Sequence, residues 1–264
     1  MRLAATAMAM PLLLLLLAGG ALAQLADAAP EDIEIGLSTD TVFITSDFRG
    51  ANLTIFGALD DADPLIQRQG GYDIVAVLEG PRRTIVVRKK TRVLGVWINT
   101  RSMVFTDVPA SYSIAMTRQP QDITDTPSYQ RLGLRIPYLN LRPLAADADP
   151  QAVEEFTTAL RNRMEESGLY TELAGGVQFL SRSLFRATFH LAPNVPVGTH
   201  RARAFLFRNG VFVKETSAAL TIRKAGAEQR LFEFAHQQSL AYGLLAVLLA
   251  MITGWLGRLI FKRD

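Results

Sequence analysis

The stretch SLAYGLLAVLLAMITGWLGRLIF, from Ser239 to Phe261, separates the chain into a membrane anchor and the part that the anchor tethers. Its first 19 residues, as far as Gly257, carry no charge, and the whole stretch reaches roughly 33 Å as a helix. That length matches a hydrocarbon layer of about 30 Å. Because a backbone in lipid must satisfy its own hydrogen bonds, we predict one transmembrane helix over residues 239–261. A buried helix of a soluble core is the alternative.

The N-terminus resembles a secretory signal. Arg2 precedes an apolar block that is too short to span a bilayer comfortably, and Ala21-Leu22-Ala23 supplies the small residues of a cleavage site. We predict cleavage after Ala23, with an uncleaved N-terminal anchor as the alternative. Export would place the domain in the periplasm and the C-terminus in the cytoplasm, with the anchor in the inner membrane.

The residues that flank the anchor agree with this orientation. Positive charges tend to remain on the cytoplasmic side, and aromatic rings favour the interface between lipid and water. The predicted membrane-interface residues are Tyr242, Trp255, Arg258, Lys262 and Arg263.

Composition limits how the exported part is stabilised and what it binds. The sequence has no cysteine, so its stability must come from apolar burial rather than from disulfides. The formal net charge of +3 argues neither for nor against nucleic acid, but export does argue against it. We therefore expect the lipid bilayer as a partner and no nucleic acid.

Short alternating apolar runs between residues 31 and 117 predict antiparallel strands at roughly ten-residue spacing. Trp97, within a predicted strand Val93–Asn99, is the best candidate for a central aromatic residue of the core. The eight predicted strands are 33–37, 41–45, 52–57, 72–79, 84–88, 93–99, 103–106 and 111–117.

A proline-rich connector and a helix follow. Asp149-Pro150 is a typical helix start, apolar residues recur at three- and four-residue steps as far as Met164, and Gly168 provides the stop. After Gly168 the strand pattern returns, with Asn209-Gly210 as a two-residue hairpin turn that needs positive φ at both positions. The predicted strands here are 177–180, 184–191, 199–207, 211–215 and 219–223.

These patterns predict a mainly β fold: an immunoglobulin-like antiparallel β-sandwich of one or two modules, with one amphipathic helix and a C-terminal transmembrane helix. Tyr112 and His200 begin comparable strands after a proline, so we expect both to serve as structural hydrogen-bonding groups at corners. The predicted segments are a signal peptide 1–23, a β-sandwich module 24–118, a connector and helix 119–167, a second β module 168–225, a juxtamembrane segment 226–238, the membrane helix 239–261 and a cytoplasmic tail 262–264.

A search for chemistry yields little. The three histidines show no ligand spacing, and no recognised catalytic motif is present. Asp60, Asp61 and Asp63 could hold a hard cation, but they lack the further ligands of a calcium loop, which favours a solvated acidic loop. We therefore expect no catalytic residue, no cofactor and no metal.

Basic residues form the strongest polar feature of the sequence and frame one predicted strand. They suit a solvated strand edge that resists aggregation, or contact with anionic lipid head groups or an acidic partner surface. The candidate interaction patch comprises Arg82, Arg83, Arg88, Lys89, Lys90 and Arg92.

Several stretches together resemble the family of alphaproteobacterial putative transmembrane proteins, namely residues 75–81, 96–99, 105–109, 168–170, 184–187, 194–199 and 254–256. The resemblance implies a periplasmic domain on one C-terminal membrane helix and a functional association with a sulfite-exporter-like permease. It supplies no catalytic residues.

Three classes of function remain open. The favoured one is a non-enzymatic accessory or scaffold subunit that docks to an integral membrane protein of a transport or envelope complex. The second is a periplasmic ligand-binding or sensing module, which requires a pocket with convergent polar groups. The third is an envelope hydrolase whose paired carboxylates come from separate strands.

Overall fold

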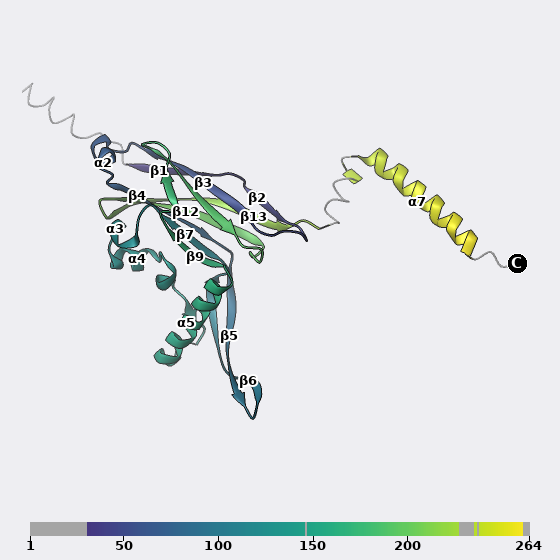
Figure 1. The fold of residues 1–264 in the computed structure, drawn as a ribbon, viewed down its shortest axis with the longest axis horizontal. Coiled ribbons are helices and arrows are strands. Elements are labelled where there is room, and N and C mark those ends of the chain that lie inside the picture. The colour runs from purple at the N-terminus through teal and green to yellow at the C-terminus, as the bar shows by residue number, and fades with distance from the viewer. Residues whose placement is uncertain (1–30, 146, 227–234, 237, 261–264) are drawn as a thin grey trace, which may run out of the picture.

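A computed structural model gives the fold of residues 31–145, 147–226, 235–236 and 238–260. The predicted signal peptide, the tail with Lys262 and Arg263, and most of the juxtamembrane segment lie outside these described residues. The fold is mainly β, as predicted, with several antiparallel sheets and a C-terminal apolar helix (Figure 1).

Two sheets form the sandwich. The four-stranded sheet has the order β1 (Asp32–Leu37), β3 (Ala51–Asp60), β11 (Leu184–Leu191), β10 (Val177–Phe179). The six-stranded sheet has the order β2 (Thr41–Ile44), β13 (Val211–Lys224), β12 (Gly198–Arg208), β4 (Tyr72–Glu79), β7 (Tyr112–Met116), β9 (Tyr170–Ala174). All pairs are antiparallel except the two at the edges of the larger sheet, β2 with β13 and β7 with β9.

The two β-rich regions of the sequence belong to one sandwich. β3 pairs with β11 over eight residues, and β4 pairs with β12 over eight residues. Strands from residues 24–118 and from residues 168–225 therefore pair with each other within both sheets. Of the two arrangements left open by the sequence, one module or two, the structure has one.

The six-stranded sheet is the middle layer, because both of its faces are covered. Along β4 every residue is buried. Ile74, Ala76 and Leu78 pack against the four-stranded sheet, while Val75 and Val77 pack on the opposite side. This double burial explains the continuous apolar run of β4, which a strand with one solvated face would not need.

Helices and a hairpin cover the second face of the middle layer. The predicted proline-rich connector forms short helical elements, and the apolar side chains of this segment complete the core, among them Ile123, Tyr129 and Leu134. The helical elements are α2 (Pro64–Arg68), α3 (Pro120–Ile123), α4 (Thr126–Leu132), η1 (Ile136–Tyr138) and α5 (Pro150–Glu166).

Helix α5 confirms the predicted amphipathic helix and its ends. The Asp149 carboxylate accepts hydrogen bonds from the amides of Gln151 and Ala152, and Gly168 follows the helix with a φ of +70°. Phe156 and Leu160 are buried against the second core.

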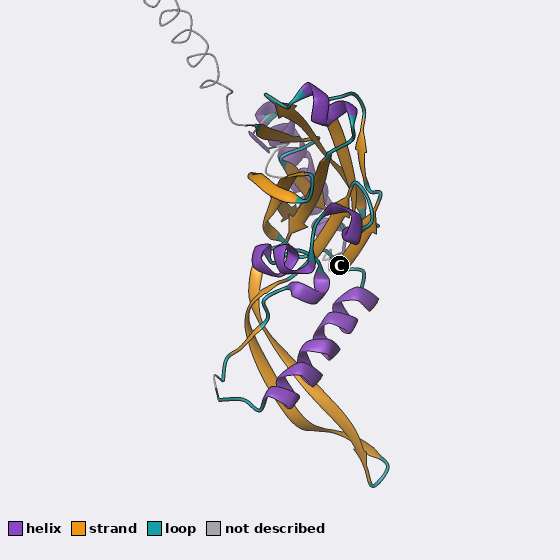
Figure 2. Ribbon diagram, turned by 90° about the vertical axis from the view of Figure 1, so that its left-hand side faces the viewer, coloured by secondary structure: helices purple, strands orange, loops and turns teal. Residues whose placement is uncertain are grey.

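The third sheet departs most from the sequence prediction. It consists of β5 (Arg82–Val93), β6 (Val96–Pro109) and the short β8 (Arg142–Pro143). The three predicted strands 84–88, 93–99 and 103–106 are thus two long strands joined by the turn Leu94-Gly95. They form a hairpin that projects beyond the sandwich and beyond the end of α5 (Figures 1 and 2).

Trp97 lies near the end of this hairpin and is 65% exposed, so its predicted place in the core is wrong. The segment around Trp97 does form a strand, as its alternating apolar residues predicted, but that strand lies outside the sandwich. The core instead closes around Phe105, Phe205 and Phe207, which are fully buried.

Helix α7 (Ser239–Ile260) is the predicted anchor. Its segment Ser239–Gly257 is long and apolar enough to cross a membrane, and none of that segment is buried within the protein. This exposure excludes the alternative of a buried core helix for the described structure. Tyr242 and Trp255 lie on it near opposite ends, and the backbone of Arg258 continues the same helix.

Candidate functional site: the projecting hairpin

The β5–β6 hairpin carries all six residues of the predicted basic patch on one strand, but it distributes them among three environments. At the base, Arg82 is paired with two carboxylates, at 2.7 Å from Glu79 and 2.6 Å from Asp107. Burial favours the neutral form of Arg82, but these carboxylates outweigh it and raise its pKa. Arg83 donates to the Val197 carbonyl at 3.0 Å. These two cations hold the hairpin to the sandwich.

The middle of the hairpin is braced by α5. Lys89 donates to the Glu155 carboxylate at 2.5 Å, and Arg101 on β6 approaches the same carboxylate at 3.8 Å. The hydrogen bond from Lys89 lowers the pKa of Glu155. Arg101 also lies over the ring of Phe156. The brace holds the hairpin beside α5, which runs along it (Figure 2).

Arg88, Lys90 and Arg92 form the remaining cationic group. Alternate residues of a strand share a face, so these three lie opposite the face on which Lys89 contacts α5. Within the part of the chain that the structure describes, Arg88 and Lys90 make no ion pair, and Arg92 donates only to the Gly95 carbonyl, at 3.3 Å. Of the six basic residues predicted from sequence, these three therefore have no ion-pair partner among the described residues, and we call them the free cations.

The hairpin tip, residues 93–98, is a candidate interaction surface that the sequence pattern did not predict. Leu94 is fully exposed, and Val93, Val96, Trp97 and Ile98 are all among the exposed large apolar residues. A signal for it was present, because a glycine inside the apolar run 93–98 is typical of a turn between two strands.

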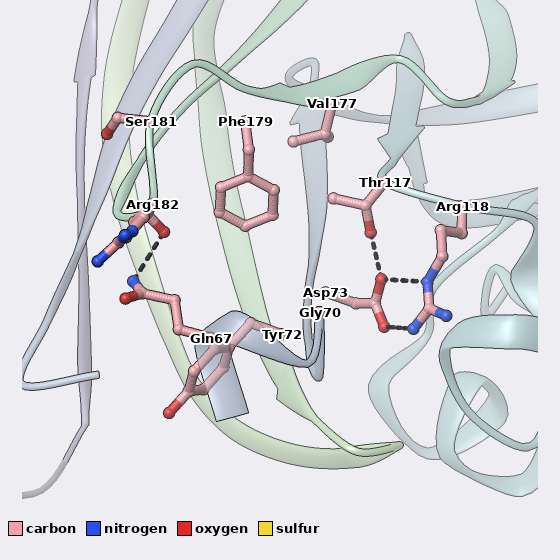
Figure 3. Close-up of a pocket in the computed structure, with 10 residues that line it drawn as sticks. All are labelled: Gln67, Gly70, Tyr72, Asp73, Thr117, Arg118, Val177, Phe179, Ser181 and Arg182. Atoms are coloured by element: carbon pink, nitrogen blue, oxygen red, sulfur yellow. Dashed lines mark hydrogen bonds and ion pairs between the residues drawn. The ribbon is translucent and has the colours of Figure 1, made fainter. Parts of the chain in front are cut away.

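A pocket of about 390 Å³ opens between the two sandwich sheets near the ends of β4 and β10 (Figure 3). Asp73 forms part of the pocket wall and is only 2% exposed. Its carboxylate accepts hydrogen bonds from the Arg118 guanidinium and from the Thr117 hydroxyl, the second at 2.7 Å. Phe179 and Val177 form the apolar side, and the Gln67 side chain bonds the Arg182 carbonyl. The carboxylate is satisfied by its own neighbours, which is typical of a structural ion pair.

The other polar candidates have structural partners. Asp63 caps α2 by accepting from the Leu65 amide, and no cluster of potential metal ligands occurs among the described residues. His200 is fully buried and its Nδ1 lies 3.3 Å from the Gly198 carbonyl, as expected for a structural donor, while its Nε2 has no hydrogen-bond partner among the described residues. Tyr112 does bond to backbone, but it accepts from the Arg135 amide in the connector.

The described structure defines a class: a membrane-anchored β-sandwich protein with a projecting hairpin and one candidate membrane helix among the described residues. A family model described as "Putative transmembrane protein (Alph_Pro_TM)" matches residues 32–263. The protein therefore belongs to this family, and the resemblance noted from sequence is confirmed. No curated protein shows significant similarity to the chain.

Proposed function

We propose that this protein is a non-enzymatic accessory or scaffold subunit of a membrane transport or envelope complex. Its sandwich would be held by α7 at the periplasmic face of the inner membrane, with the C-terminus in the cytoplasm. Its partner would be an integral membrane protein, and the family resemblance makes a sulfite-exporter-like permease the first one to look for.

The observation that carries the proposal is the braced hairpin. Three separate contacts, at Arg82, Arg83 and Lys89, fix it to the sandwich and to α5, while its far end presents apolar side chains and free cations. A group of exposed apolar side chains in a water-soluble domain marks a surface that another molecule covers. An arm with these properties suits attachment to a larger assembly at the membrane.

Affinity purification tests the proposal most simply. The chain would carry a tag after Asp264, and native membranes would be cross-linked and solubilised in mild detergent. We expect one polytopic membrane protein to be recovered in near-stoichiometric amount. Recovery of the tagged chain alone, at tagged expression equal to the native level, would contradict an accessory role.

The Asp73 pocket favours a second candidate, a periplasmic ligand-binding module. It combines an aromatic wall at Phe179 with polar groups at Gln67, Arg118 and Arg182, which is the composition of a small-molecule site. A thermal-shift screen of the purified full chain against small metabolites tests it. A stabilising ligand whose effect disappears in Phe179→Ala and persists in the Phe43→Ala control, another exposed phenylalanine, would support this function.

A further inference from the structure

The turn at the end of the hairpin breaks a local rule of sequence. Leu94 has a φ of +50° and Gly95 a φ of +86°, so both central residues adopt positive φ. Glycine, asparagine and aspartate suit the first position of such a turn, whereas a leucine there is uncommon. Leu94 is in addition fully exposed, so no contact inside the protein compensates for its backbone conformation. A residue that fits its turn poorly and contacts nothing suggests a role outside the fold.

The tip is apolar on both of its faces. Directly opposed residues of an antiparallel pair share a face, so Val93 lies beside Val96, and Ile98 beside Thr91. Trp97 lies on the other face, opposite Arg92, and Leu94 lies at the end. A flat protein surface would cover only one face of a hairpin, whereas lipid can surround it. The distribution of apolar groups therefore favours lipid.

The free cations lie next to the tip, on the same face of the hairpin as Trp97. Arg92, Lys90 and Arg88 succeed one another at two-residue steps of about 7 Å. A tip immersed in the interfacial layer would bring Arg92 and Lys90 to the level of the head groups, where anionic lipids attract basic side chains. Charge and apolar surface thus point to the same partner.

We propose that the tip, residues 93–98, inserts into the interfacial layer of the bilayer that holds α7, with Arg88, Lys90 and Arg92 against anionic head groups. Fourteen residues separate the end of β13 from the start of α7, which allows at most about 50 Å between them. The same chain therefore keeps the sandwich that carries the hairpin within reach of the bilayer that holds α7. The inference rests on the proposed function, since it assigns the contact that the exposed arm makes.

Insertion is shallow for a physical reason. A two-stranded hairpin leaves the outer backbone groups of both strands without partners, and such groups are costly in the hydrocarbon layer. The apolar part covers only the pair Val93 with Val96, the turn, and Trp97 and Ile98 on β6, so it fits the boundary between head groups and acyl chains. Arg92 satisfies the Gly95 carbonyl within the turn, which reduces that cost.

Tryptophan fluorescence in vesicles tests the insertion. The chain has two tryptophans, so Trp255→Phe leaves Trp97 as the single reporter. This variant would be reconstituted alone into vesicles of phosphatidylcholine and phosphatidylglycerol, with acyl chains either unmodified or brominated near the head group. We expect Trp97 emission at short wavelength and a loss of intensity with brominated chains.

Three further variants sharpen the test. In the same background, Leu94→Asn should shift Trp97 emission to longer wavelength and reduce quenching, whereas Leu65→Asn, at an exposed leucine on α2, should change neither. A double variant that combines Arg88→Gln with Lys90→Gln removes two charges. In anionic vesicles it should lower the ratio of inserted to free tip by roughly fivefold for each charge removed.

The outcomes separate this inference from the proposed function, because the vesicles contain no other protein. Unquenched, long-wavelength emission from Trp97 would overturn insertion whatever the purification shows. If Trp97 becomes shielded only in a purified complex, the tip docks on protein. Quenching in vesicles together with no recovered partner would instead support insertion and contradict the accessory role.

Discussion

Leu94 and Asn209 occupy the same position in two equivalent hairpin turns of this protein. Each precedes a glycine, Gly95 or Gly210, and each has positive φ, +50° for Leu94 and +47° for Asn209. The turn at Asn209 has the residues that this geometry favours, and the turn at Leu94 does not. The backbone geometry of the turn therefore does not explain why residue 94 is a leucine.

Replacing Leu94 with asparagine should therefore stabilise the hairpin. Asparagine tolerates positive φ, so we expect Leu94→Asn to gain up to about 1 kcal/mol locally. Slower amide hydrogen exchange at residues 88–102 would report the gain. Faster exchange there would show that Leu94 supports the turn through a contact within the fold.

Gly57 should be intolerant of a side chain, because Phe185 lies against it. A Cβ at position 57 would stand 2.3 Å from the Phe185 ring and 2.7 Å from the Glu34 carbonyl oxygen. We expect Gly57→Ala to lower the free energy of unfolding by about 2 kcal/mol. Gly36→Ala, on the strand paired with β3, meets no atom within 4 Å and should be neutral or slightly stabilising. Equal denaturation midpoints for the two variants would contradict this packing.

The ion pair between Asp73 and Arg118 should matter more than ion pairs on the surface. Arg118→Ala leaves the 2% exposed carboxylate with Thr117 as its remaining partner, and we expect a loss of about 2 kcal/mol. Arg163→Ala removes an exposed pair with Glu166 and should cost less than about 0.5 kcal/mol. Chemical denaturation at neutral pH compares them, and similar losses would refute the distinction.

His200 should make stability depend on pH. Burial lowers its pKa below the usual value near 6.5, and the nearby Arg83 acts in the same direction. As pH falls below about 6.5, the unfolded chain binds a proton that the folded chain does not, so the free energy of unfolding decreases. We expect this loss between pH 7 and pH 5 to be smaller in His200→Gln. Parallel pH curves for the two proteins would be inconsistent with a neutral buried imidazole.

The sequence correctly predicted those elements that depend only on residues close together in the chain. The cap at Asp149, the turn at Asn209-Gly210 and the apolar anchor each depend on neighbouring residues, and each was found where the sequence placed it. The two-sided burial of β4 was likewise consistent with its unbroken apolar run.

The features that failed depend on distant contacts. Whether the strand around Trp97 is buried is decided by where the sandwich ends, and alternation alone does not contain that information. The connector contains prolines at positions that start α3 and α4, so short helices form in a segment for which the sequence pattern predicted only a connector. Pairing of β3 with β11 and of β4 with β12 spans more than 120 residues, beyond what periodicity reports.

The same limit applies to the candidate site. Six basic residues stood out in the sequence, but only the structure separates Arg82, Arg83 and Lys89, which have partners, from the three that do not. The apolar tip is exposed because β5 and β6 project beyond the sandwich, which the sequence pattern alone does not reveal.

Photo-crosslinking in native membranes tests the central claim, that the hairpin tip is a second membrane contact. A diazirine amino acid would replace Leu94 in one sample and Leu65 in the other, and the adducts would be analysed by mass spectrometry. We expect phospholipid adducts at position 94 and few or none at position 65. Adducts at position 94 made only to a polypeptide, or equal lipid labelling at both positions, would contradict it.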